Sequence, residues 1–264
     1  MYEFAYHRPG SVSEAAKLAG DHAEGKLLAG GMTLLPTMKQ RLAGPSDIID
    51  LSRLNDLRGI EVKDGVVTIK ALTRHVTVAT SPEVKAAIPA LAELAGMIGD
   101  PAVRNRGTIG GSVANNDPAA DYPSACLALG ATITTNKRAI KADDFFKGLF
   151  ETALEEGEII TSISFPVPEK ANYQKFRNPA SRYALVGVFV AKTGGHVRVA
   201  VTGAGSNGVF RVKDFEAALD ANFAPAALDG KSVPASGLNS DIHADAEYRA
   251  HLITVMAKRA VAAA

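Results

Sequence analysis

Two glycine-containing segments place the strongest limits on how this chain can fold. They are residues 28–36, with the pair Gly30-Gly31, and residues 107–121, with the pair Gly110-Gly111. Each segment combines its glycines with hydroxyl or amide side chains. Because glycine lacks a Cβ, such a backbone can come very close to a polar ligand, and its N–H groups can converge on an anion. The two segments make a nucleotide ligand the first hypothesis.

The residues around the first glycine pair predict a small βαβ unit. Strands are expected at residues 26–29 and 48–51, and apolar residues at helical spacing predict a helix over residues 33–42. The positive end of that helix and four or five main-chain donors, at roughly 1.5–3 kcal/mol each, can hold a pyrophosphate without any lysine. On this segment alone, a tight connection that binds nothing is an equally good interpretation.

The second segment offers side chains suited to phosphate oxygens, a heterocyclic ring or sugar hydroxyls. The hydroxyl and amide groups are Thr108, Ser112, Asn115 and Asn116, and the carboxylate suited to ribose or ribityl hydroxyls is Asp121. Two such turns suggest a dinucleotide held between two subdomains. The alternative for Asp117 and Asp121 is capping of a helix at residues 122–129, and we expect Asp117 to be a cap rather than a ligand.

Composition excludes several classes of protein. The 264 residues carry 29 basic and 28 acidic side chains, mixed along the sequence, so no footprint for nucleic acid is present. No signal peptide or membrane-spanning run is visible, and we expect a cytoplasmic protein without a transmembrane segment. Cys126 is the single cysteine, which excludes an internal disulfide, a cysteine-based zinc site and a self-contained iron–sulfur cluster. The six histidines show no ligand spacing, and each is expected to be a surface or core residue.

The remaining pattern predicts further α and β elements. Ser11 and Glu14 predict a capping box that opens a helix ended by Gly20. Asp64-Gly65 predicts a hairpin at the start of a second subdomain, and the prolines at residues 166–168 close an alternating strand at a domain boundary. Another hairpin over residues 183–202 and helices near 214–219 and 246–262 follow. Residues 203–208 match the letters of a dinucleotide fingerprint, but a β-prone stretch follows them, so we expect a loop.

Several motifs together resemble the FAD-binding medium subunit of the molybdenum hydroxylases, the family of xanthine dehydrogenase and aerobic carbon monoxide dehydrogenase. These motifs lie at residues 4–9, 29–31, 104–111, 117–121, 158–160 and 173–175. The resemblance implies an α+β fold: a two-subdomain FAD-binding domain of the vanillyl-alcohol oxidase type, followed by a C-terminal α+β domain. The expected limits are residues 1–53 and 54–167 for the two subdomains and 168–264 for the last domain.

The resemblance also implies the cofactor site. The residues expected to hold the pyrophosphate are Ala29, Gly30, Gly31, Met32, Thr33, Leu34, Thr108, Ile109, Gly110, Gly111 and Ser112. Asp121 would hold the sugar-like part of FAD, Ile98 and Ile160 would pack near it, and Lys175 would lie at its edge. From the residues alone, Lys175 is better read as a solvated strand residue, and the resemblance reverses that preference modestly.

In function, the resemblance implies an oxidoreductase subunit whose FAD takes electrons from a partner and passes them to an external acceptor. A small subunit would carry two [2Fe-2S] clusters and a large one molybdopterin, as a dimer of heterotrimers. We expect no catalytic acid, base or nucleophile and no metal site in this chain. Residues 178–183 replace an acidic stretch of the xanthine dehydrogenase branch, which leaves the acceptor open. The alternatives are a stand-alone flavin oxidoreductase of the same fold and a flavin-free assembly protein.

Overall fold

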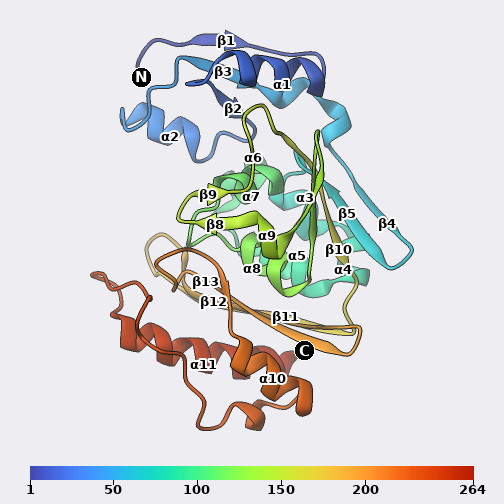
Figure 1. Ribbon diagram of the computed structural model, residues 1–264, viewed down its shortest axis with the longest axis vertical. Coiled ribbons are helices and arrows are strands. Elements are labelled where there is room, and N and C mark those ends of the chain that lie inside the picture. The colour runs from blue at the N-terminus through green and yellow to red at the C-terminus, as the bar shows by residue number, and fades with distance from the viewer.

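The computed structural model describes residues 1–264 as three tiers stacked along the long axis of the molecule (Figure 1). In the N-terminal tier, β3 lies between β1 and β2 in a parallel sheet, with the helices α1 and α2. The elements of this tier are β1 (Ala5–His7), α1 (Val12–Asp21), β2 (Lys26–Leu28), α2 (Leu34–Lys39) and β3 (Asp47–Asp50). Two 3₁₀ turns, η1 (Leu51–Arg53) and η2 (Asn55–Leu57), lead out of it.

The middle tier is an antiparallel sheet in the order β4-β5-β10-β6-β7 together with short helices. Its strands are β4 (Ile60–Lys63), β5 (Val66–Lys70), β6 (Thr132–Thr135), β7 (Ala139–Lys141) and β10 (Ile160–Pro166), and a small hairpin is formed by β8 (Phe146–Gly148) and β9 (Glu151–Thr152). Its helices are α3 (His75–Thr80), α4 (Pro82–Ala87), α5 (Pro89–Gly96), α6 (Pro101–Arg106), α7 (Ile109–Asn115), α8 (Tyr122–Ala128) and α9 (Ala142–Phe145).

The C-terminal tier is a second antiparallel sheet, in the order β11-β12-β13-β14, with two helices and a 3₁₀ turn. Its elements are β11 (Lys170–Arg177), β12 (Ala184–Thr193), β13 (His196–Thr202), β14 (Phe210–Arg211), α10 (Lys213–Ala221), η3 (Pro225–Leu228) and α11 (Ala246–Ala263). In Figure 1 the helices α10 and α11 lie on the side of this sheet that faces away from the middle tier.

The C-terminal sheet is buried on both faces, which explains why β12 is apolar along most of its length. Alternate residues such as Val188 and Val190 pack against α10 and α11, while Phe189 and Ala191 belong to the core of the middle tier. The helices α5 and α8 of the middle tier contact this second face. Two-sided burial favours a continuous apolar run over an alternating one.

Local sequence signals account for several of these elements. Ser11 Oγ accepts a hydrogen bond from the N–H of Glu14 at 3.1 Å, and the Glu14 carboxylate accepts one from the N–H of Gly10, so the expected cap opens α1. At the predicted hairpin, Asp64 and Gly65 have φ of 50° and 72°, the left-handed values that such a turn requires. The parallel pairing of β2 with β3 confirms the predicted βαβ unit.

Other sequence-based expectations were wrong in detail. Gly20 does not end α1, which continues through Asp21, and the helix expected over residues 33–42 is limited to α2. The edge strand β1 was not predicted because only three residues of it pair with β3. The second glycine pair lies in the first turn of α7 rather than in a turn of its own. Residues 203–208 form a loop, as expected.

Candidate functional site

A cleft with a volume of about 970 Å³ is lined by residues from all three tiers. A volume of this size is at the upper end of the usual range for ligand sites. Of the sixteen predicted site residues, fifteen line it. These are Ala29, Gly30, Gly31, Met32, Thr33, Leu34, Ile98, Thr108, Gly110, Gly111, Ser112, Asn115, Asp121, Ile160 and Lys175.

The first glycine segment lines this cleft and carries a row of main-chain donors without a partner. The N–H groups of residues 29–34 donate to no acceptor within the protein, although these residues are mostly half-buried. Most buried or half-buried N–H groups in proteins are hydrogen-bonded, so six consecutive free ones are unusual. They precede the N-terminus of α2, whose dipole also favours an anion.

The two glycine segments touch each other. A Cβ on Gly30 would collide with the main chain of Arg106 and Gly107, and a Cβ on Gly111 would lie 3.6 Å from the Cβ of Ala29. At Gly30, part of the reason for glycine is therefore the packing of one segment on the other rather than the approach of a ligand, whereas a Cβ on Gly111 would make only an ordinary contact with Ala29. Gly31 has a different reason, since its φ of 75° is strained for any other residue.

The second glycine segment contributes fewer free donors than predicted. The N–H groups of Ile109 and Gly110 donate to Thr73 O and Ala71 O, and that of Gly111 donates to Thr108 Oγ1. Ile109, which was also expected in the site, does not line the cleft, because its side chain is buried in the core. Among residues 107–112, only the N–H of Thr108 has no acceptor within the protein.

Polar side chains of both segments complete the lining. Those of Thr33, Ser112 and Asn115 line the cleft and make no hydrogen bond within the protein. By contrast, the amide of Asn116 donates to Gly148 O and Glu151 O at 2.8 Å each, so it is a structural group outside the cleft. Asp117 does not cap α8: it accepts from the N–H of Ala119 and faces the cleft.

Asp121 and Lys175 form a buried ion pair at the wall of the cleft. Lys175 Nζ lies 3.0 Å from Asp121 Oδ2, and the Lys175 side chain is 1% exposed. Tyr173 OH donates to the other carboxylate oxygen at 2.5 Å. Burial raises the pKa of Asp121, and the ammonium of Lys175 opposes that rise. The interpretation of Lys175 as a solvated strand residue was therefore wrong, because its strand faces the middle tier.

His75 lines the cleft and was not predicted as a site residue. It is the first residue of α3 and is 4% exposed. Its ring packs against Gly107, since a Cβ added there would lie only 2.5 Å from His75 Nε2. Its Nδ1 is buried without a hydrogen-bond partner. Burial lowers the pKa of His75 to about 4, and the charge of Arg104 contributes, so the ring is neutral at pH 7. No spacing motif marks this histidine; only its contact with the glycine segment does.

The cleft also draws on a loop of the C-terminal tier. Residues 180–183, between β11 and β12, line it together with Phe150 of the middle tier. Arg182 adopts a φ of 63° in this loop. The segment that differs from the xanthine dehydrogenase branch is thus part of the cleft wall.

Comparison with known proteins identifies the family of this chain. Residues 2–168 match the family described as FAD binding domain in molybdopterin dehydrogenase. This chain is a FAD-binding medium subunit of the molybdenum hydroxylases. The carbon monoxide dehydrogenase medium chain of Hydrogenophaga pseudoflava is 36% identical over 99% of this chain and 96% of that protein. The nicotine 6-hydroxylase medium subunit of Paenarthrobacter nicotinovorans is 35% identical over 97% of this chain and 95% of that protein.

A solved structure gives the same fold for the medium subunit. Carbon monoxide dehydrogenase from Hydrogenophaga pseudoflava, in a form that lacks the Mo-pyranopterin moiety, superimposes with a TM-score of 0.89 at 37% identity. The match covers 99% of this chain and 97% of that one. The expected α+β fold is therefore confirmed, as is the assignment to an oxidoreductase family.

The residues of the cleft fit FAD. A diphosphate needs several hydrogen-bond donors, and the N–H groups of residues 29–34 with the Thr33 and Ser112 hydroxyls supply them. The apolar side chains of Ile98 and Ile160 line the same cleft and suit an aromatic ring system. No helix of the medium subunit is long and apolar enough to cross a bilayer.

Proposed function

We propose that this medium subunit is the electron-transfer component of a molybdenum hydroxylase complex, with FAD held in the cleft. The observation that carries the proposal is the row of six unpartnered N–H groups at residues 29–34, in a chain of an FAD-binding family. When bound, FAD supplies one- and two-electron redox chemistry, and the protein supplies position and electrostatics.

Each part of the cleft has a proposed role. The donors of residues 29–34, with the free N–H of Thr108 and the side chains of Ser112 and Asn115 beside them, would hold the diphosphate and adjoining polar groups, and Gly110 and Gly111 would line the same cleft. Asp121 retains acceptor capacity for a sugar hydroxyl, since a carboxylate has about four lone-pair sites and two bonds are present. Ile98 and Ile160 would exclude water from the ring system, and Lys175 would hold Asp121 in its ionised form.

The other redox centres are assigned to partner chains. Cys126 is fully buried in the core, and burial raises the pKa of its thiol, so it offers no cluster ligand. We propose a small subunit with two [2Fe-2S] clusters and a large subunit with molybdopterin, assembled as a dimer of heterotrimers. The relatives support a complex of several chains, since they are named as medium chains or subunits.

Purification of the chain with the polypeptides that bind it tests this proposal. We expect a yellow complex that contains iron, molybdenum and extractable FAD. After reduction of its clusters by limiting dithionite without oxygen, the flavin absorbance should bleach as the cluster absorbance recovers. A complex in which the clusters stay reduced beside oxidised flavin would contradict electron transfer. A colourless chain that takes up no FAD would contradict the cofactor assignment and favour an assembly role.

A further inference from the structure

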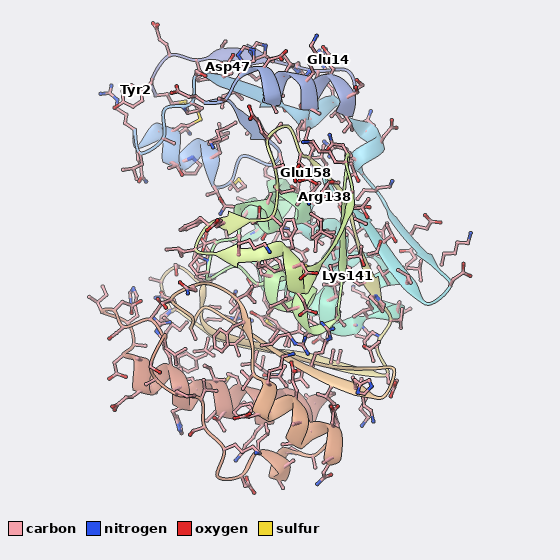
Figure 2. The ribbon with its side chains drawn as sticks, in the orientation of Figure 1. Tyr2, Glu14, Asp47, Arg138, Lys141 and Glu158 are labelled. Atoms are coloured by element: carbon pink, nitrogen blue, oxygen red, sulfur yellow. The ribbon has the colours of Figure 1, made fainter.

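The N-terminal tier contains a second group of ligand-type side chains, which does not line the cleft. His7 ends β1, His22 follows α1, and Asp47 begins β3. His7 Nε2 lies 2.6 Å from one carboxylate oxygen of Asp47, and His22 Nδ1 lies 3.4 Å from the other. One ligand atom from each residue lies within 4.8 Å of the other two. Figure 2 labels Asp47 in this tier, at the end of the molecule opposite α10 and α11.

The fold, rather than local sequence, brings these three residues together. They come from three separate elements, and the parallel pairing of β1 with β3 sets His7 opposite Ile49, two residues along β3 from Asp47. The two imidazole rings are 5.2 Å apart at an angle of 30°. Asp47 is 6% exposed and also accepts a hydrogen bond from Ser46 Oγ. Two imidazoles thus face one buried carboxylate, which is a donor set that Zn²⁺ binds in proteins.

We propose that His7, His22 and Asp47 form a binding site for a divalent first-row metal ion of the zinc type, with water as a further ligand. Bonds of about 2.0–2.1 Å in a tetrahedral arrangement separate ligand atoms by about 3.3 Å. The separation of His22 Nδ1 from Asp47 Oδ2, 3.4 Å, already fits this value, whereas His7 Nε2 lies beside the other carboxylate oxygen. The separation between His7 and Asp47 must open by roughly 0.7 Å, which the edge position of β1 permits.

The position of the site determines how an ion can enter it and what binding would do to the fold. The side chains of His7 and His22 are 27% and 36% exposed, so an ion can enter from solvent. A bound ion would tie the three-residue edge strand β1 and the end of α1 to β3. Because the folded chain alone brings the three ligands together, binding should stabilise the fold.

A zinc titration of the tag-free full-length chain, first stripped with a chelator, tests the proposal. We expect calorimetry to show one saturable site per chain. Loss of an outer-shell partner of a metal ligand typically costs about 10–100-fold in affinity, so His7→Gln and His22→Gln should each cost roughly tenfold or more. The control is His196→Gln, which removes an exposed histidine 4.0 Å from Asp220 and should leave zinc affinity unchanged.

Two further measurements keep the test decisive. A fixed concentration of Zn²⁺ should raise the melting temperature of the wild type and of His196→Gln by more than those of His7→Gln and His22→Gln. If either variant fails to fold, X-ray absorption of zinc in the wild type decides, because imidazole ligands give a characteristic scattering pattern. Equal zinc affinity in the wild type and both folded variants, no saturable uptake by the wild type, or zinc without imidazole ligands would each overturn the proposal.

Discussion

The backbone at Gly31 sets the course of the free N–H groups that face the cleft. Its φ is 75°, and a Cβ there would lie 2.8 Å from Leu35 Cδ1 and 3.2 Å from Leu28 Cδ1. A branched residue is strained in the left-handed region by about 1–2 kcal/mol and would relax out of it. Such relaxation turns the neighbouring N–H groups away from the positions that they share.

Gly31→Val is therefore expected to lower the affinity for FAD at least tenfold, roughly 1.4 kcal/mol, in a protein that still folds. Flavin absorbance per chain and a titration with FAD measure the effect. Gly230→Val is the matched control, because Gly230 has a φ of 71° but no atom near its Cβ position and lies outside the cleft. Equal flavin content in the two variants would argue against the role of residues 29–34.

His75 predicts a dependence of stability on pH. Its pKa is lowered to about 4 in the folded state by burial, whereas the unfolded chain binds the proton near pH 6.5. The unfolded state therefore binds more protons between these values, and stability falls as pH drops from 6.5 toward 4. The loss should be on the order of 3 kcal/mol.

His75→Gln should remove this loss. Urea unfolding gives the free energy of unfolding of the wild type and the variant at pH 7 and pH 4.5. The change between the two pH values is then compared between the two proteins, so that the contributions of other titrating groups cancel. His251→Gln, an exposed change on α11, is the control. A pH dependence of His75→Gln as steep as that of the wild type would show that the ring is protonated in the folded protein.

At the scale of elements, the loop before β10 is fixed by one carboxylate. Glu158 accepts from Arg138 Nε at 3.0 Å and Arg138 Nη2 at 3.1 Å, and also from Thr135 Oγ1 and the N–H of Glu155 (Figure 2). Burial opposes the charged form, but these hydrogen bonds outweigh it and lower the pKa of Glu158 to about 2. Residues 154–160 line the cleft, so this carboxylate fixes part of its wall.

Glu158→Gln should lower the free energy of unfolding at pH 7 by on the order of 3 kcal/mol, because the charge-assisted bonds are lost. The stabilisation belongs to the ionised form, so it is present above pH 4.5 and lost as pH falls toward 2. Chemical unfolding at pH 7 and pH 3 measures both effects. Glu156→Gln, an exposed change in the same loop, should have little effect. Equal stability of the two variants would contradict the assigned role.

The elements with strong local signals were predictable, whereas those set by distant contacts were not. The cap of α1, the Asp64-Gly65 hairpin and the loop at residues 203–208 follow from their own residues. The strand β1 depends on pairing with β3, more than forty residues later in the chain. The N–H groups of Ile109 and Gly110 in α7 donate to Thr73 O and Ala71 O, which are distant in sequence. The glycine pair alone therefore could not predict that these donors are already used. The place of His75 in the cleft was not predictable either, because it depends on packing against Gly107.

At the scale of the whole molecule, the wall of the cleft depends on contacts between the middle and C-terminal tiers. Asp121 pairs with Lys175 of β11, and Thr202 of β13 donates to Pro118 O and Ala120 O at 3.0 and 2.6 Å. The C-terminal sheet thereby positions the segment that carries Asp121. The division of the chain at residues 53 and 167 stays a prediction.

Lys175→Met should destabilise the protein by about 3–5 kcal/mol, because it leaves the Asp121 carboxylate buried without its partner. The double variant Lys175→Met/Asp121→Asn removes both charges and should recover most of the loss, since Tyr173 can still donate to the amide oxygen. Calorimetric melting temperatures and urea unfolding measure the two variants. A double variant as unstable as the single one would show that the pair matters through packing rather than charge.

The two-faced burial of the β11–β14 sheet governs how this protein can be divided. The family match ends at residue 168, yet a piece cut there would leave the apolar surfaces of α5 and α8 bare and the ligand pocket open on one side. An engineer who grafts the tail of a relative onto this chain must therefore transplant matching residues at Phe189, Ala191 and Ala200. Because residues 1–168 and 169–264 share one hydrophobic core, we expect neither part to fold independently.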